Sequence, residues 1–99
     1  MTVFNERDLV ALTVPIPLAE AGHVPEDSLL RKSGNYEEGL LPGDVGTIVD
    51  ACGGGEAFTV EFLEPDGCLI ALPTVYSTQI RPATKVDLAN DRFWHRARI

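Results

Sequence analysis

Hydrophobic and polar residues alternate most regularly in the middle of the chain, where Phe58, Val60 and Phe62 are separated by single polar residues. A period of two is typical of a strand that buries one face against a core. We therefore predict a strand over 57–63. A second β-prone run covers 45–52, and the glycine-rich turn between the two predicts a hairpin.

Three shorter strands complete the pattern. One covers 8–14 and stops at prolines, which lack the N–H group that a β-ladder needs. Residues 64–67 predict a tight turn, because proline fixes φ and glycine accepts a positive φ. A strand over 68–72 follows and ends at Pro73, and the last strand covers 79–81. Five short strands lose their exposed edges by closing on themselves, so we predict a mainly β fold, a small five-stranded barrel.

Residues 18–42 form a long segment with little strand pattern, interrupted by glycine and proline. Within it, 25–32 fits two helical turns, because the stretch begins with Pro25 and acidic residues and ends with Arg31 and Lys32. A structureless loop of this length is unusual in a compact domain. The segment is therefore either an elaboration of the fold or a binding element.

Several of these stretches together resemble a known family. The residues that carry the resemblance are 8–12, 41–49, 58–62, 70–72 and 79–82. The pattern resembles the DUF4926 family, small bacterial proteins of uncharacterised function, over residues 8–17 and 40–83. The resemblance implies an SH3-like barrel and no catalytic residues.

The central motif of that pattern is Gly43-Asp44-Val45-Gly46-Thr47. It is similar to a motif of KOW and other SH3-like barrels, in which the first glycine makes a tight turn and the second lets the strand pack closely. The resemblance implies these structural roles for Gly43 and Gly46. We expect Asp44 to cap the turn or to face water.

The chain departs from the family pattern in two places. It uses residues 18–39 to cross from the first strand to the glycine turn, and it adds a C-terminal tail. We therefore divide it into an SH3-like barrel domain, residues 1–84 with the long loop 18–42, and a basic, aromatic extension, residues 85–99.

Charge is distributed unevenly along the 99-residue chain, whose formal net charge is −7. Residues 1–80 hold three basic and thirteen acidic side chains, a charge of −10, whereas residues 81–99 hold five basic and two acidic ones, a charge of +3. An acidic body argues against nucleic-acid binding, which requires a basic face, and suits a basic protein partner. No apolar stretch is long enough to span a bilayer and no signal peptide is visible, so we expect a cytoplasmic protein without a membrane partner.

No set of residues points to catalysis. Gly53-Gly54-Gly55 lacks the lysine and hydroxyl residue of a phosphate-binding loop, so a hairpin turn is favoured. His23 lies among acidic residues, but tetrahedral zinc needs several His or Cys ligands, and a solvated loop is favoured. Cys52 and Cys68 are expected to be free thiols that lie far apart on the sheet. We expect a structural role for both, because the sequence places no histidine beside either of them. We predict no enzyme, no cofactor and no metal.

The C-terminal stretch 93–98 combines aromatic and arginine side chains, which are enriched at interface hot spots. Three alternatives are open for it: folding back on the acidic barrel, docking on a second subunit, or serving as an arm for another partner. The side chains that we predict to contact a protein are Tyr36, Phe93, Trp94, Arg96 and Arg98.

Two functions of different classes follow. The leading hypothesis is a non-catalytic protein-interaction module that self-associates as a homodimer or other homo-oligomer, with Trp94 and loop 18–39 as contact elements. The alternative is an antitoxin- or immunity-type protein that neutralises a basic partner, because acidic patches speed the capture of basic proteins. An enzymatic or metal-dependent function would require metal or ligand in the purified protein.

Overall fold

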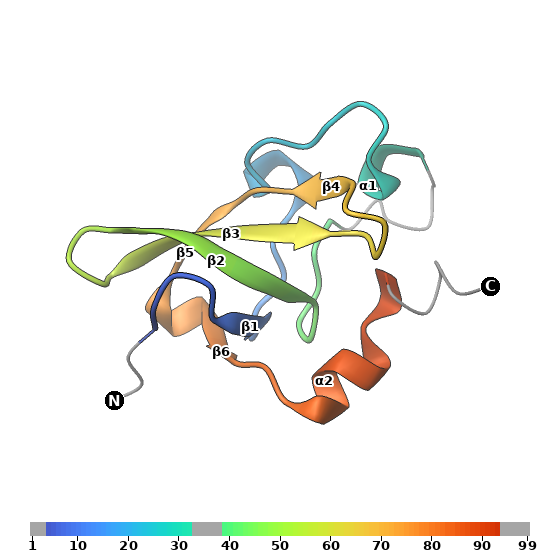
Figure 1. Ribbon diagram of the computed structural model, residues 1–99. Coiled ribbons are helices and arrows are strands. Elements are labelled where there is room, and N and C mark those ends of the chain that lie inside the picture. Colours follow the sequence, from blue (N-terminus) through green and yellow to red (C-terminus); the bar gives the residue numbers. More distant parts are fainter. Residues whose placement is uncertain (1–3, 33–38, 94–99) are drawn as a thin grey trace.

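The computed structural model describes residues 4–32 and 39–93, which build one antiparallel sheet with short helices around it (Figure 1). The sheet order is β4-β3-β2-β1-β6, and β5 also pairs with β3. The predicted mainly β class is confirmed. The strands are β1 (Leu9–Leu12), β2 (Val45–Cys52), β3 (Ala57–Leu63), β4 (Leu69–Ala71), β5 (Thr74–Tyr76) and β6 (Ile80–Pro82).

The β2–β3 hairpin has the predicted bounds, because its signals are local. Phe58, Val60 and Phe62 are all buried on one face of β3, as the alternation predicted. Residues 53–55 turn the chain with φ values of 62°, 70° and 98°, which glycine adopts without strain. The second half of β2, residues 49–52, is exposed, so the end of the hairpin projects from the body as an arm on the left of Figure 1.

The strand after the second turn ends before Pro73, as predicted, but it is followed by a further strand, β5, that the sequence analysis did not predict. β4 pairs with the end of β3 (Phe62 opposite Ala71), and β5 pairs with its start (Phe58 opposite Val75). Between them the Pro73 carbonyl accepts the Val60 N–H at 3.0 Å. Proline lacks only the donor, so a ladder can continue through its carbonyl, and six strands form where five were predicted.

The sheet is open, so the closure expected for a barrel is not formed among the described strands. β5 leads into β6 through the 3-10 helix η3 (Ser77–Gln79), and the Thr13 N–H bonds to the Gln79 carbonyl at 2.9 Å. The outer edge of β4 is covered by a loop: the Ser28 hydroxyl donates to the Ile70 carbonyl at 2.6 Å, and the Leu72 N–H to the His23 carbonyl at 3.1 Å. Covering an edge is a second way to protect it.

The described part of the long loop belongs to the core. It contains the 3-10 helix η1 (Leu18–Glu20) and α1 (Leu29–Lys32), which is one helical turn where two were predicted. Leu40 exchanges two backbone hydrogen bonds with Ile16, at 2.8 and 2.9 Å. The loop residues that are buried in the core cluster are Ala21, Val24, Leu30 and Leu40. The sequence predicted an elaboration or a binding element, and the structure shows that these four residues contribute to the hydrophobic core.

The C-terminal extension contains a helix that the sequence analysis did not predict, α2 (Lys85–Asn90). Thr84 and Asp87 form a capping box, in which each side chain accepts the other's backbone N–H. Asp87 also holds Arg81 through two hydrogen bonds of 2.6 and 2.7 Å, which hold the pKa of the Asp87 carboxyl well below its usual range. No helix in the described part of the chain is long and apolar enough to span a membrane.

Candidate functional site

The glycine turn joins the long loop to β2. The Asp44 carboxylate accepts the Leu41 N–H at 2.8 Å, which caps the turn, and the Asp44 carbonyl accepts the Leu12 N–H at 3.0 Å, which ties the turn to β1. Gly43 has a φ of 91°, a conformation that favours glycine. A Cβ on Gly46 would lie 2.6 Å from Val60 Cγ1, so this strand crossing has no room for a side chain.

Asp44 does not face water. Its side chain is 5% exposed and is paired with Arg92, whose guanidinium donates from Nε to Oδ1 at 3.0 Å and from Nη2 to Oδ2 at 2.8 Å. The same Nη2 donates to the Gly39 carbonyl at 2.6 Å. Burial raises the pKa of the Asp44 carboxyl, although Arg92 and the Leu41 N–H oppose this shift. The pair fastens the extension to the turn.

The predicted contact residues fall into two groups. Phe93 is 1% exposed and packs in the core cluster. The Arg92 guanidinium lies over its ring, with Cζ 4.7 Å from the ring centroid. The ring is therefore not available to a partner in this structure. The other four, Tyr36, Trp94, Arg96 and Arg98, lie outside the described residues. The described part of the tail therefore folds back on the body, which was one of the three alternatives.

A shallow groove of about 290 Å³ lies between α2 and the sheet. We call it the β–α2 groove. Its apolar lining includes Leu9 from β1, Leu63 from β3 and Leu88 from α2. Leu9 and Leu88 are 47% and 41% exposed. The remaining lining residues are Val45, Gly46, Thr47, Glu61, Glu64, Pro65 and Gly67.

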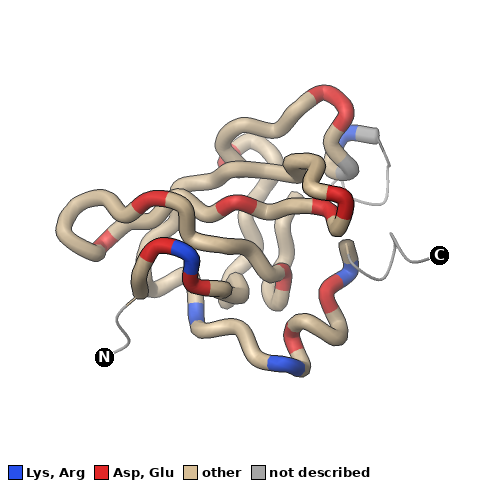
Figure 2. Tube along the Cα trace, in the orientation of Figure 1, with Lys and Arg blue, Asp and Glu red and all other residues tan. Residues whose placement is uncertain are grey.

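The charged residues among the described lining of the β–α2 groove are all acidic. Glu61 lies on β3 and Glu64 on the turn that follows it, where Figure 2 shows acidic positions in red. No Lys or Arg is among the described residues that line the groove. The Glu61 carboxylate makes no hydrogen bond or ion pair with any described residue. An apolar groove with carboxylates is suited to a cationic segment that also carries apolar side chains.

A second hollow, of about 320 Å³, lies between the glycine turn and the extension, lined by residues 41–44 and by Asp87, Asn90 and Arg92. Its lining includes Asp44 and Arg92, which bond to each other, and Asp87, which bonds to Arg81. Since these charges are matched within the chain, we see no ligand chemistry for this hollow.

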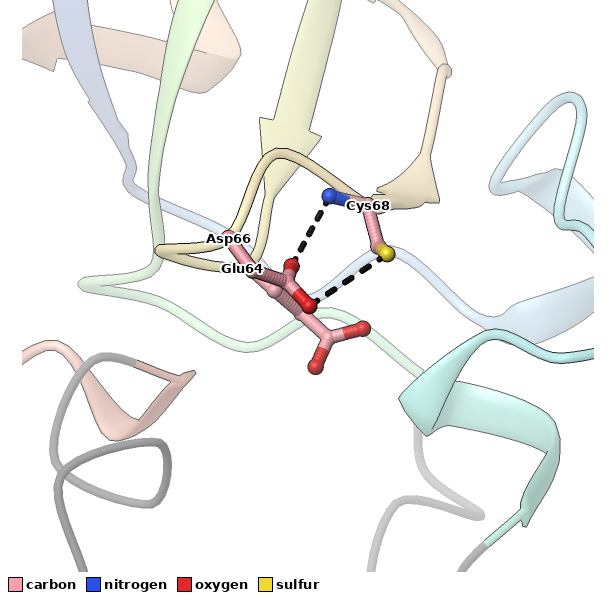
Figure 3. Close-up of side chains that lie close together, drawn as sticks. All are labelled: Glu64, Asp66 and Cys68. Carbon is pink, nitrogen blue, oxygen red and sulfur yellow. Dashed lines mark hydrogen bonds between the residues drawn. The ribbon is translucent and has the colours of Figure 1, made fainter.

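The turn between β3 and β4 gathers Glu64, Asp66 and Cys68 (Figure 3). Asp66 accepts the Cys68 N–H at 3.0 Å and the Cys68 thiol at 3.4 Å. These bonds lower the pKa of Asp66 and raise the pKa of the Cys68 thiol, which keeps the sulfur protonated. The thiolate is the form that attacks or binds metal, so the arrangement suppresses that chemistry.

Among the described residues, the candidate groups considered from the sequence do not assemble into one site. His23 and its acidic neighbours do not form a set of three close ligand atoms, whereas Glu64, Asp66 and Cys68 do so within 4.8 Å. Cys52 and Cys68 are both exposed, and both are free, as expected from their places at opposite turns.

Comparison with known proteins gives one family. The family model described as a domain of unknown function, DUF4926, matches residues 6–82, well over half of the chain. The chain belongs to the DUF4926 family. No curated protein and no solved structure shows a significant match.

The DUF4926 match ends earlier in the chain than the packed core does. The match includes the long loop, which the structure shows in the core, and it ends at Pro82, before α2. Leu88 of the β–α2 groove, Arg92 of the buried pair and Phe93 of the core all lie beyond it. The groove, the buried pair and this part of the core therefore combine residues of the extension with residues of the DUF4926 match.

The sequence analysis missed the groove and the buried pair for different reasons. Thr84 followed three residues later by Asp87 is a local capping signal that could have predicted α2 and hence placed Leu88 on a helix. Asp44 and Arg92 are 48 residues apart, and no local pattern links them.

Proposed function

We propose that this protein is a non-catalytic protein-interaction module that self-associates, as a homodimer or other homo-oligomer, and works in the cytoplasm. The observation that carries the proposal is the β–α2 groove with its exposed leucines. Leu9 and Leu88 expose 47% and 41% of their surface around a hollow. Apolar groups gathered around a groove are typical of an interaction site, whereas scattered ones are not.

The rest of the described molecule supports a binding role over a catalytic one. Burial raises the pKa of Asp44, but the bidentate bond from Arg92 occupies its carboxylate. The exposed Cys68 thiol is held protonated by Asp66. Neither arrangement provides an activated base or nucleophile.

Analytical ultracentrifugation of the full chain from low to high micromolar concentration tests self-association. We expect a concentration-dependent dimer or higher oligomer, weakened by Leu88→Glu in the groove. Val49→Glu is the matched control, because Val49 is equally exposed, at 42%, but lies on the hairpin arm. A chain that stays monomeric at high micromolar concentration would exclude this function.

The second candidate is capture of a basic protein, as an antitoxin- or immunity-type partner would do. It is favoured by the charge of −10 on residues 1–80 and by the absence of any basic residue among the described residues lining the groove. Electrostatic attraction of this kind speeds association and weakens with salt. Purification from the native source at low salt should then yield a basic protein in equal amount that is released by high salt. Recovery of the chain alone would count against this candidate.

A further inference from the structure

We propose that the β–α2 groove binds the basic C-terminal segment of a second copy of this chain, residues 94–99. This inference rests on the proposed self-association and names the surface and the occupant. The groove is the acceptor, through Glu61 and the leucine side chains around it. The donor segment has the sequence Trp94-His95-Arg96-Ala97-Arg98-Ile99, and it lies outside the described residues.

The chemistry of the groove selects the occupant. Its lining includes Leu9, Leu63 and Leu88, so a partner must bring apolar surface. The described lining residues include the Glu61 carboxylate and no Lys or Arg, so the partner must also be cationic. Glu61 is half-buried and makes no ion pair with a described residue, and a partner's guanidinium would supply the missing countercharge. A volume of about 290 Å³ suits one or two side chains and not a large cofactor.

The chain itself contains a segment with these properties. Residues 81–99 carry a charge of +3 against −10 for the rest, and the last six residues combine two arginines with a tryptophan and an isoleucine. Tryptophan and arginine are the side chains most enriched at interface hot spots. The complementarity is therefore between two parts of one sequence, which is what self-association requires.

The position of Phe93 fixes where the donor segment begins. Phe93 is buried in the core and Arg92 is held by Asp44, so the segment starts from a fixed point. None of residues 89–93 lines the groove, and Arg92 lines the second hollow instead. If each copy places its segment in the other's groove, the two contacts are related by a twofold axis and the assembly closes as a dimer.

A charge-exchange experiment on the full chain tests this assignment. The groove variant is Glu61→Arg and the tail variant is Arg96→Glu with Arg98→Glu. In each variant alone, groove and tail carry the same sign, so we expect the dimer Kd to rise by about tenfold or more. In an equimolar mixture, each contact of a mixed dimer again joins a groove residue 61 and a tail of opposite charge. Native mass spectrometry should therefore detect the mixed dimer in preference to the homodimer of either variant.

The controls separate this inference from the proposed function. Glu56→Arg on the hairpin turn and Lys85→Glu at the start of α2 change the same charges outside the groove and should leave the Kd unchanged. Glu61→Gln repeats the groove test with a smaller change, if the reversal prevents folding. A monomeric wild type overturns the proposed function and this inference together. A dimer unaffected by the groove or the tail variant overturns the inference alone, because the copies would then meet through other residues.

Discussion

Asp44 shows how one residue can serve both the local turn and the tertiary structure. Its carboxylate caps the turn through the Leu41 N–H and holds Arg92, 48 residues away, in a largely buried pair. A buried pair often contributes little compared with apolar residues, yet the loss of one partner leaves the other charge without compensation. The two partners should therefore respond unequally to substitution.

Arg92→Met should lower the free energy of unfolding by about 3 kcal/mol, because Asp44 is then buried without its countercharge. Asp44→Asn should cost less, about 1–2 kcal/mol, because burial already opposes the charge and Arg92 retains 23% exposure. The double variant should be more stable than Arg92→Met alone. Urea unfolding of all four proteins measures this coupling, and Arg81→Met, at an exposed pair, is the control. Additive effects would contradict a coupled pair.

The raised pKa of Asp44 predicts a pH dependence with a definite sign. Between the usual aspartate pKa of 3.8 and the raised value, the folded protein holds a proton that the unfolded chain has lost. The contribution of Asp44 to stability is therefore complete below 3.8 and is lost as pH rises through the raised pKa. Unfolding free energies measured from pH 3 to 7 should show this fall in the wild type relative to Asp44→Asn. Parallel profiles for the two proteins would contradict it.

The exposed Cys68 thiol should react slowly with alkylating reagents. Cys68 bonds to Asp66 and its pKa is raised mainly by that bond, so less thiolate is present near pH 8 than for an unperturbed thiol. Iodoacetamide, which is neutral, tests this in a Cys52→Ser protein, where Cys68 is the cysteine that remains. The substitution Asp66→Asn should accelerate the alkylation of Cys68. Equal rates before and after that change would show that Asp66 does not control the thiol.

Among the elements, the predictions from sequence succeeded where the signal was local and failed where packing decided. The β2–β3 hairpin is specified by its alternation and glycine turn, and both strands have the predicted bounds. Pro73 ends β4 as predicted, but its carbonyl accepts the Val60 N–H, and β5, which was not predicted, pairs with the start of β3. The burial of Leu40, the open sheet and the Asp44–Arg92 pair depend on contacts between distant segments, which no window of sequence contains.

The long loop gives a prediction at the scale of elements. Leu40 is fully buried and is bonded through its backbone to Ile16, so the loop holds the core as a strand would. Leu40→Ala should lower the free energy of unfolding by about 2–5 kcal/mol, the range for cavities in cores. Leu88→Ala, at 41% exposure, should cost below about 1 kcal/mol. A small effect at Leu40 in urea unfolding would restore the interpretation of this segment as an accessory.

At the scale of the whole molecule, the C-terminal extension contributes to the hydrophobic core. The sheet leaves β4 and β6 unpaired with each other among the described strands, and the core receives residues from the loop on one side and Phe93 from the C-terminal side. The family match ends at Pro82, but the hydrophobic core extends to Phe93. A boundary drawn after residue 84 from sequence separates segments that the structure packs together.

Two truncations test whether the extension belongs to the folding unit. A chain that stops at Ala83 loses the buried Phe93 ring and leaves Asp44 without Arg92, which together should remove about 5 kcal/mol. That is comparable to the whole stability of many small domains, so we expect no cooperative unfolding transition. A chain that stops at Phe93 keeps both contacts and should unfold cooperatively, while losing the segment proposed to join two copies. If the chain ending at Ala83 is as stable as the chain ending at Phe93, the family-matched region folds alone and the extension serves only in binding.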